Sequence, residues 1–435
     1  MTLAVYSEKD VHPSHLGNPL ILALRPSMSD VDASTALMVK PDLVVSEERK
    51  LPPHVRVHGV AAIADIFIPT QNTISLYSRV DIELKRALRR KSPFLAETQR
   101  RLDTLQETAS DAWKQTEGQI GKAVKSNKDP LQEIGAGLPN IRSILVVGPS
   151  GKGKSTSVRR VLMANSQVIE HLEFEGKIFR QKQLVWLSVQ APINASISGL
   201  CESILQAIDR ALGLSGDKSY SKQYTGKRLT NDVLIAKVAQ VLASHYLGIL
   251  HIDDLQRIAE GTKANISALI SFIMQLSDVV GSPLVLSGTP KLVGILSRSV
   301  EVARRCCSAG MEELTLADEY IEKGNFDLLM NGLFKFQLLP KDCESKEKVT
   351  KVILERSQDI TAVAVSLFIH AQIIGLRTGK ESLDSDLIEQ AYEGLRPLHV
   401  ALDALRRKDH DALSKYEDIV SVNDALKLAI SGGAM

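Results

Sequence analysis

The stretch that decides the fold reads Gly148-Pro149-Ser150-Gly151-Lys152-Gly153-Lys154-Ser155. It follows the apolar run Ser143–Val147 and leads into a helix-compatible run, Ser155–Ala164. The pattern G-x-x-x-x-G-K-[S/T] between a strand and a helix is typical of a phosphate-binding loop. Its glycines let backbone N–H groups surround phosphate oxygens, and the N-terminus of the following helix favours negative charge. The alternative is a chance glycine-rich turn, which the flanking strand and helix disfavour.

The residue types within this loop indicate separate roles. Lys154 is placed to reach the β- and γ-phosphates of ATP and to act on their charge in catalysis, and the Ser155 hydroxyl is placed to ligate Mg²⁺. The sequence therefore predicts ATP and Mg²⁺ as cofactors. The expected nucleotide contacts are Gly148, Pro149, Ser150, Gly151, Lys152, Gly153, Lys154, Ser155 and Thr156.

A second motif, Gly248–Asp254, is an apolar strand pattern that ends in two acids. In P-loop ATPases an acid at the tip of a neighbouring strand holds the Mg²⁺ shell. We assign that role to Asp253 and expect Asp254 to polarise the attacking water. Alone, this run would be interpreted as a buried strand with a capped exit, but the P-loop favours the functional interpretation. A further strand pattern, Leu184–Val189, lies between the two motifs, which is typical of the additional-strand ATPases that include the AAA+ proteins.

Two later segments add candidates for catalysis. The run Pro283–Leu286 reads as a buried strand that ends in small polar residues, and a hydroxyl there can sense the γ-phosphate. We choose Thr289 over Ser287 for this role. Arg304 and Arg305 follow a helix-like segment, from which arginine can reach the nucleotide of a neighbouring subunit and stabilise transition-state charge. The alternatives are a simple turn and a solvated basic pair at a helix end.

The organisation of the chain changes at two points. From residue 143 strand and helix patterns alternate, and after Pro340 the pattern is purely helical. Alternation indicates a parallel sheet covered by helices. The predicted fold class is α/β, an AAA+ P-loop ATPase with a parallel sheet core followed by an α-helical lid and C-terminal region. We expect a weakly structured arm over residues 1–50, a mostly helical region over 51–137, the ATPase core over 138–325, the lid over 326–410 and a tail over 411–435.

Composition limits the classes of function. The 435 residues include 53 Lys+Arg and 51 Asp+Glu, a formal net charge of +2, so a nucleic-acid surface has to be a local patch. The four cysteines show no metal-ligand spacing, which fits a reduced cytoplasm. The N-terminus lacks the features of a signal peptide. The longest uncharged stretch, Ile360–Leu376, contains several polar residues, so we expect a buried helix and no membrane partner.

Two basic clusters are candidates for contacting DNA. Basic residues interleaved with aromatics suit a nucleic-acid backbone, and one cluster surrounds Tyr220 and Tyr224 in a predicted loop. That cluster, our choice for the DNA site, consists of Lys218, Lys222, Lys227 and Arg228. The rival cluster lies on a predicted helix and consists of Lys85, Arg86, Arg89, Arg90 and Lys91. For each cluster the alternative is a solvated face.

Segments outside the ATPase motifs make the chain similar to the TnsC/TniB family of AAA+ regulators from bacterial transposons, and closer to the TnsC branch. The resemblance extends over residues 51–420. The segments that carry it are Leu51–Val57, Gln167–His171, Gln183–Leu187, Gly288–Lys291 and Lys415–Asp418.

This resemblance implies a protein that oligomerises on duplex DNA in the ATP state, as a ring or a helical filament. It implies that the oligomer links a TniQ- or TnsD-like target selector to the transposase subunits and that ATP hydrolysis disassembles it. Nucleotide and Mg²⁺ contacts fall on Gly148–Thr156 and Asp253. Two positions depart from the family pattern. Asp254 stands where glutamate is common, which predicts slow hydrolysis, and Asp359–Val363 occupies the place where many AAA+ lids carry an arginine.

Two other functions share these motifs. A replication initiator or helicase loader has the same core motifs, and the TnsC-like flanks and the lack of an obvious winged-helix pattern after the lid disfavour it. An ATP-locked scaffold would bind nucleotide and hardly hydrolyse it. Phosphate release with and without duplex DNA separates the scaffold from a working ATPase.

Overall fold

The computed structural model describes residues 1–117, 141–225, 231–316 and 323–409, with Leu413, Tyr416, Ile419 and Val422 beyond them. Its centre is a five-stranded sheet of parallel pairs in the order β5-β6-β7-β2-β8. Four of these strands confirm the apolar runs expected from the sequence, with small shifts at their ends, and β8 was not expected. The strands are β2 (Ile144–Val147), β5 (Trp186–Gln190), β6 (Ile249–Asp253), β7 (Leu284–Gly288) and β8 (Met311–Glu313).

The strand order brings the predicted motifs together. β7 lies between β2, which precedes the P-loop, and β6, which ends in the acids. The register pairs Val147 with Gly288 and Ile252 with Leu286. Because parallel strands end at the same edge, the P-loop, the acids and the hydroxyls after β7 all lie at one edge of the sheet, where ligands of open α/β sheets bind.

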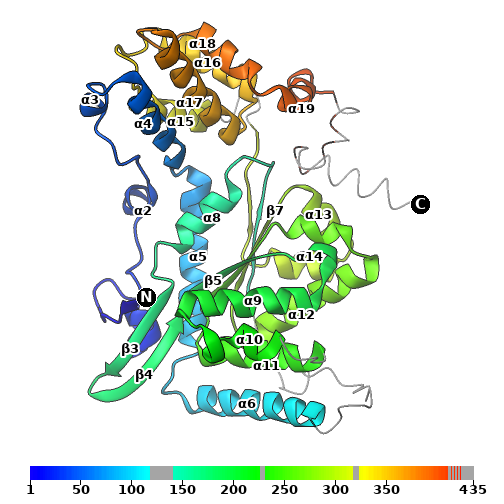
Figure 1. Ribbon diagram of the computed structural model, residues 1–435. Helices are drawn as coiled ribbons and strands as arrows, with labels where there is room; N and C mark the ends of the chain where they lie inside the picture. Colours follow the sequence, from blue (N-terminus) through cyan, green and yellow to red (C-terminus); the bar gives the residue numbers. More distant parts are fainter. Residues whose placement is uncertain are drawn as a thin grey trace.

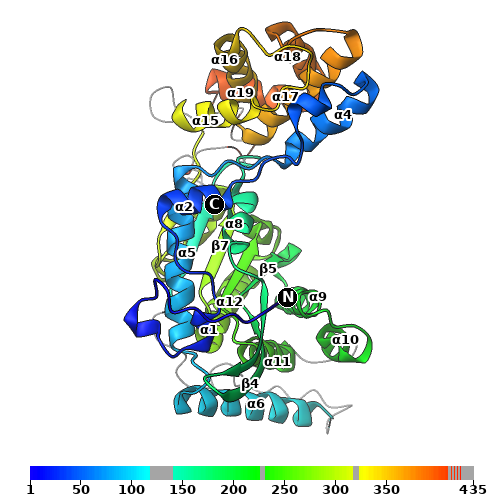
Figure 2. The same cartoon turned by 90° about the vertical axis from the view of Figure 1, so that its left-hand side faces the viewer.

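Helices cover both faces of the sheet (Figure 1, Figure 2). Strand residues alternate between the two faces, so Ile144 and Val146 belong to one apolar cluster and Leu145 and Val147 to the other. The first face packs against α5 (Gln71–Arg89) and the P-loop helix α8 (Lys154–Leu162). The second face packs against α9 (Ile197–Leu212), α11 (Asn231–Ser244), α12 (Lys263–Val280) and α13 (Lys291–Leu296).

The first fifty residues are folded onto the core, so the expectation of a weakly structured arm was wrong. Leu20, Ile21 and Leu24 are buried in the same cluster as α5. These apolar residues lie in a short run that is buried on all sides. Its sequence therefore lacks the alternation of apolar and polar residues that marks an amphipathic helix or strand. The segment contains β1 (Thr2–Leu3), the 3-10 turn η1 (Pro13–His15), α1 (Pro19–Leu22), α2 (Asp30–Leu37) and α3 (Val45–Glu48).

A small second sheet stands beside the core. Its strands β3 (Val168–Phe174) and β4 (Lys177–Leu184) form an antiparallel hairpin, and β1 pairs with β3. α5 ends at Arg89, and α6 (Ala96–Glu117) begins after Ser92-Pro93, because proline interrupts a helix. α6 crosses the bottom of the core in Figure 1 and packs on α11.

The lid lies above the sheet edge that carries the motifs and has its own apolar core around Phe368 (Figure 1). α4 (Pro53–Ala62), from the N-terminal region, packs against α17 and joins this core. Asp384 caps α18, accepting a hydrogen bond from Leu387 N–H at 2.8 Å. The lid helices are α15 (Lys323–Leu333), α16 (Lys346–Ser357), α17 (Thr361–Thr378), α18 (Ser385–Glu393) and α19 (Arg396–Arg407).

By length and composition alone, α17 is long and apolar enough to cross a membrane. In the folded protein 50% of this helix is buried. Those buried residues form the centre of the lid, as expected for a core helix. Most of the predicted tail, including Lys415, Glu417 and Asp418, lies outside the described residues. The boundaries drawn at residues 137, 325 and 410 remain a prediction.

Candidate nucleotide-binding site

The P-loop turns sharply between β2 and α8. Gly151 has φ +77° and Gly153 has φ +97°, values at which a side chain is strained. A Cβ at Gly151 would lie 2.9 Å from Ile360 of the lid. These glycines are therefore required for the loop to curl around a ligand and for the lid to approach it closely.

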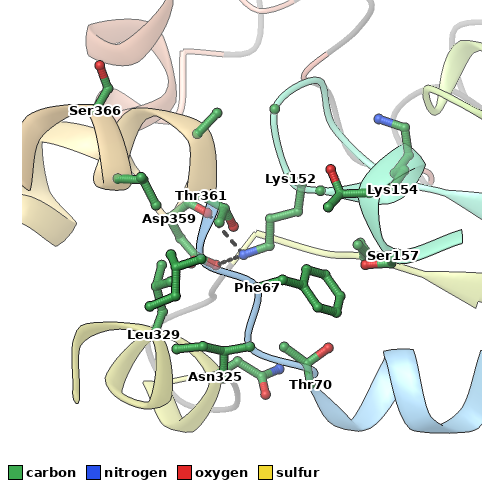
Figure 3. Close-up of a pocket in the computed structure, with 18 of the residues that line it drawn as sticks. Phe67, Thr70, Lys152, Lys154, Ser157, Asn325, Leu329, Asp359, Thr361 and Ser366 are labelled. Atoms are coloured by element: carbon green, nitrogen blue, oxygen red, sulfur yellow. Dashed lines mark hydrogen bonds and ion pairs between the residues drawn. The ribbon is translucent and has the colours of Figure 1, made fainter. Parts of the chain in front are cut away.

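The two lysines of the loop point in different directions (Figure 3). Lys154 is buried, and its Nζ donates to the Pro149 carbonyl at 2.8 Å. Lys152 reaches the lid, where it pairs with the Asp359 carboxylate and donates to the Asp359 carbonyl at 3.0 Å. Lys154 thus stays on the loop where phosphate would bind, and Lys152 connects the loop to the lid.

Ser155 and Asp253 meet, as the sequence predicts for a Mg²⁺ site. The Ser155 hydroxyl lies near enough to the Asp253 carboxylate to lower its pKa, and Asp253 Oδ1 accepts from Ser287 Oγ and from Asp254 N–H. Burial opposes ionisation of Asp253, but His251 and these hydrogen bonds outweigh it, so its pKa lies below the ordinary value. An ionised carboxylate beside a hydroxyl is a fitting oxygen donor set for Mg²⁺, which keeps several waters and needs few protein ligands. Within the described ranges, no group of three or more His, Cys, Asp or Glu side chains is arranged to hold a metal ion.

His251, in the middle of β6, is a site residue that sequence reasoning missed. Its Nδ1 lies 2.9 Å from Ser188 Oγ and its Nε2 lies 2.8 Å from Ser287 Oγ. Burial lowers the pKa of His251 to about 4, although Asp253 and Asp254 act in the opposite direction. The imidazole is therefore neutral at pH 7. An apolar strand pattern with one histidine gives no signal for such a contact.

Asp254 lines the cavity described below and has a left-handed backbone, with φ +53°. Its Oδ1 accepts from Gln256 Nε2 at 3.2 Å, and Gln256 Oε1 accepts from Thr289 N–H at 3.2 Å. The Thr289 hydroxyl is buried and has no hydrogen-bond partner among the residues that the structure describes. Ser287, the residue we ranked second, is the one that contacts Asp253, because β7 continues to Gly288 and keeps Ser287 beside β6.

A cavity of about 800 Å³ lies between the P-loop and the lid. One side consists of P-loop residues and Asp254, and the other is largely apolar and includes Phe67, Leu329 and Ile369. Figure 3 shows Phe67 and Leu329 on the same side of the loop as Lys152. The volume suits a cofactor-sized ligand. The apolar side combines residues 61–73, α15 and α17, and no motif predicted their proximity.

Arg304 and Arg305 lie on α14 (Val300–Cys306) but have different surroundings. Arg305 pairs with Asp278 of α12 and donates to the Met274 carbonyl at 3.3 Å. Arg304 is exposed. Arg305 is therefore tied within its own chain, and Arg304 is the better candidate for reaching a neighbouring subunit.

Half of the chosen DNA cluster can be placed. Lys218 and Lys222 are exposed on the turn η4 (Gly216–Lys218) and on α10 (Tyr220–Thr225), whereas Lys227 and Arg228 lie outside the described residues. The predicted loop is thus partly helical. Tyr220 bonds through its hydroxyl to His245 Nε2 at 3.1 Å, and Tyr224 stacks on Tyr220. Both tyrosines pack against the core.

The rival basic cluster does not form a continuous exposed face, because its two lysines are buried. Lys85 is buried and pairs with Asp81 at 2.8 Å. Lys91 is buried, donates to Ser282 Oγ at 2.8 Å, and has its pKa lowered well below the ordinary value by burial and by Arg101. Arg86 pairs with Glu83 at 3.1 Å. Lys85 and Lys91 therefore stabilise the packing of α5 against its neighbours.

Comparisons with known proteins support the fold. Residues 140–296 match a family profile described as an AAA domain. No curated protein sequence matches the chain. The profile, the strand order and the P-loop together show that the chain contains an AAA domain and has the AAA+ P-loop ATPase fold, with a helical C-terminal region.

Several solved structures are similar at low identity. A Walker-type ATPase of Pyrococcus abyssi is 15% identical, with 62% of this chain and 72% of that chain covered and a TM-score of 0.39. Cdc6p from Pyrobaculum aerophilum is 13% identical, with 72% and 86% covered and a TM-score of 0.39. The ORC2 protein of Aeropyrum pernix is 15% identical, with 60% and 63% covered and a TM-score of 0.38. At these TM-scores the similarities carry no argument about function.

Proposed function

We propose that this protein is an ATP-hydrolysing regulator of transposition that binds ATP–Mg²⁺ between its core and its lid. In the ATP state it oligomerises on duplex target DNA and links a TniQ- or TnsD-like target selector to the transposase. Hydrolysis disassembles the oligomer. The observation that carries the nucleotide part is the convergence of the P-loop, Asp254 after β6 and the lid around one cavity. The transposition part is supported by the resemblance to TnsC outside the ATPase motifs.

The site residues divide the chemistry among them. The P-loop N–H groups and Lys154 bind the phosphates, and Ser155 and Asp253 hold the metal. Bound Mg²⁺ offsets charge on the β- and γ-phosphates. Asp254 orients the attacking water. Its carboxylate is one methylene shorter than the glutamate common in the family and already accepts from Gln256, so we expect slow turnover.

DNA binding follows from assembly. With a net charge of +2, one protomer attracts DNA weakly, so useful affinity has to come from many protomers on one duplex. A regulator that accepts almost any target contacts phosphates in preference to base edges. Lys218 and Lys222 are exposed and available for such contacts. ATP, by fixing the interfaces between subunits, controls DNA binding indirectly, and the reaction takes place in the cytoplasm.

Co-sedimentation with duplex DNA and steady-state phosphate release test this function together. The expected result is ATP-dependent, sequence-independent binding that weakens steeply with salt, and turnover that responds to duplex DNA. Lys218→Ala/Lys222→Ala should weaken binding uniformly across sequences. Tight binding by an ATP-free monomer, or preference for one sequence, would favour the replication-initiator alternative. DNA binding without measurable turnover would favour the ATP-locked scaffold.

The link to transposition has a separate test. Oligomers assembled on DNA with a non-hydrolysable ATP analogue are mixed with the transposase and the target selector of the same element. We expect both proteins to co-sediment with the oligomer and not with bare DNA. Failure of both to bind would remove the transposition part and leave the ATPase part in place.

A further inference from the structure

Three side chains on neighbouring strands, the exposed Ser188 and the buried His251 and Ser287, form a continuous hydrogen-bonded chain that ends at Asp253. Ser188 of β5 contacts His251 of β6 at 2.9 Å, and His251 contacts Ser287 of β7 at 2.8 Å. Ser287 then donates to Asp253 Oδ1. The register explains the alignment, because Ser188 and His251 are directly paired across β5 and β6. Alternation along β7 places Ser287 on the same face as Val285, the direct partner of His251.

The direction of the chain follows from counting protons. A serine hydroxyl has one proton, and that of Ser287 goes to the Asp253 carboxylate. Ser287 can therefore meet His251 Nε2 only as an acceptor, so Nε2 carries a proton. In the tautomer whose single ring proton is on Nε2, Nδ1 accepts from the Ser188 hydroxyl. All three hydrogen bonds consequently point toward the carboxylate.

A buried histidine between two serines could serve only to stabilise the sheet. Its position in the network favours a further role, because the chain ends on the carboxylate that also contacts Ser155 of the P-loop helix. Oδ1 of that carboxylate holds both the Ser287 hydroxyl and the Asp254 N–H. The orientation of the Asp253 carboxylate therefore depends on the direction in which the Ser287 hydroxyl donates its hydrogen bond.

We propose that His251 is a positioning residue for the Mg²⁺-binding acid. By donating to Ser287, it fixes the Ser287 hydroxyl on Asp253 Oδ1 and keeps the carboxylate turned toward Ser155. Ser188 supports this role by contacting the other ring nitrogen, Nδ1, at 2.9 Å. The proposal rests on the nucleotide site described above and concerns residues to which no role in binding or catalysis had been assigned.

The test compares nucleotide affinity with and without metal. The dissociation constant of a fluorescent ATP analogue is measured for the full chain in Mg²⁺ and in EDTA. His251→Phe keeps a ring of similar size but removes both nitrogens. We expect about a tenfold loss of affinity in Mg²⁺, as for a lost hydrogen bond in a network that ends on a charged group, and no change in EDTA.

Further variants separate positioning from stability. His251→Gln can still donate to Ser287 through its amide and should recover most of the Mg²⁺-dependent affinity. Ser188→Ala should cost about two- to threefold, and nothing more when added to His251→Phe, because the two residues act through one chain. Ser277→Ala is the matched control. Ser277 is a buried serine that donates to the Ser282 carbonyl at 2.7 Å, so its loss should lower Tm and leave the ratio of the two dissociation constants unchanged.

Equal losses in Mg²⁺ and EDTA, or a loss of Tm alone, would overturn the proposal and make His251 a structural residue. If His251→Phe does not fold, the affinities of His251→Gln and Ser188→Ala decide whether His251 is a positioning residue. The proposal then requires Ser188→Ala to weaken binding in Mg²⁺ alone and is overturned if it does not. A wild-type protein that binds no nucleotide in either condition would instead contradict the proposed function itself.

Discussion

The two sides of the nucleotide cavity are built in different ways. The core side consists of one contiguous loop and the tip of the neighbouring strand β6, and its shape depends on glycines with positive φ. The lid side is mainly apolar and combines residues 61–73, α15 and α17, which are far apart in the sequence. Phosphate charge can be bound by a local backbone loop, whereas an apolar base needs a surface that only tertiary packing supplies. The first side is therefore readable from sequence and the second is not.

Polar contacts between the P-loop and the start of α17 join the two sides. Lys152 of the P-loop pairs with Asp359, and both side chains are nearly buried. The Ala362 N–H of the lid donates to the Gly151 carbonyl at 3.0 Å. The lid therefore contacts the P-loop directly, through Asp359 and Ala362. Variants on the core side, on the lid side and at these contacts should behave differently.

The largest effect is expected on the core side. Lys154→Ala should abolish ATP binding, a loss of roughly 1,000-fold or more, because truncating one partner of a buried charge contact leaves the other unpaired. Isothermal titration measures the affinity, and circular dichroism checks that the fold is intact. Lys335→Ala, a lysine outside the cavity, is the control. Unchanged affinity in Lys154→Ala would refute the site assignment.

Asp254→Asn should separate binding from turnover. The amide keeps size and polarity but removes the charge that orients the nucleophile, so turnover should fall about 1,000-fold while ATP affinity is retained. Longer-lived oligomers on DNA should accompany the loss. Phosphate release and light scattering measure the two effects. Equal loss of binding and turnover would instead place Asp254 in the metal shell.

Arg304 and Arg305 should differ, because Arg305 is paired with Asp278 whereas Arg304 is exposed. Arg304→Ala should lower turnover about 100-fold, as for a lost transition-state donor, and leave Tm unchanged. Arg305→Ala should mainly lower Tm. Mixing Arg304→Ala with Asp254→Asn should restore partial activity at shared interfaces. If no mixture exceeds its parents while both variants assemble, Arg304 does not act in trans.

The contact between the two sides should hold the lid in place. Asp359→Ala leaves Lys152 as an uncompensated buried charge, so lid docking should weaken by about 3 kcal/mol. Faster hydrogen exchange along α17 is the expected result. Lys341→Ala breaks an exposed ion pair with Glu381 inside the lid and serves as the control that should change nothing. Identical exchange in Asp359→Ala and the wild type would show that the lid does not depend on the P-loop.

The smallest effect is expected on the lid side. Ile369→Ala removes apolar contact from the cavity and should weaken ATP and ADP binding equally, by about fivefold, since burial of the base has no dependence on phosphate number. Ile374→Ala alters the same helix away from the cavity and should leave both affinities unchanged. A loss specific to ATP would show that this part of α17 contacts phosphates.

Sequence reasoning succeeded where chemistry and chain order coincide. Gly148–Ser155 and Gly248–Asp254 are contiguous, and their strands are short apolar runs that only a buried parallel sheet accommodates. Side-chain direction was less accessible. Ser287 and Thr289 carry similar hydroxyls, and only the length of β7 decides which one faces Asp253.

Long-range partners explain the remaining differences. Lys85 and Lys91 looked exposed because their partners, Asp81 and the Leu247 carbonyl, cannot be assigned from a basic cluster alone. The pairing of Lys152 with Asp359 joins residues that no local pattern relates. Leu20 and its neighbours were misjudged for the same reason, because the surface that buries them is α5.

A cryo-EM reconstruction of the protein with duplex DNA, Mg²⁺ and a non-hydrolysable ATP analogue tests the central claim most directly. The account predicts nucleotide in the cavity between core and lid, with its phosphates at Lys154 and its base against Phe67 and Ile369. It also predicts protomers arranged along the duplex and touching its phosphate backbone, and no such assembly without nucleotide. An empty cavity in assembled protomers, or equal assembly with and without nucleotide, would contradict it.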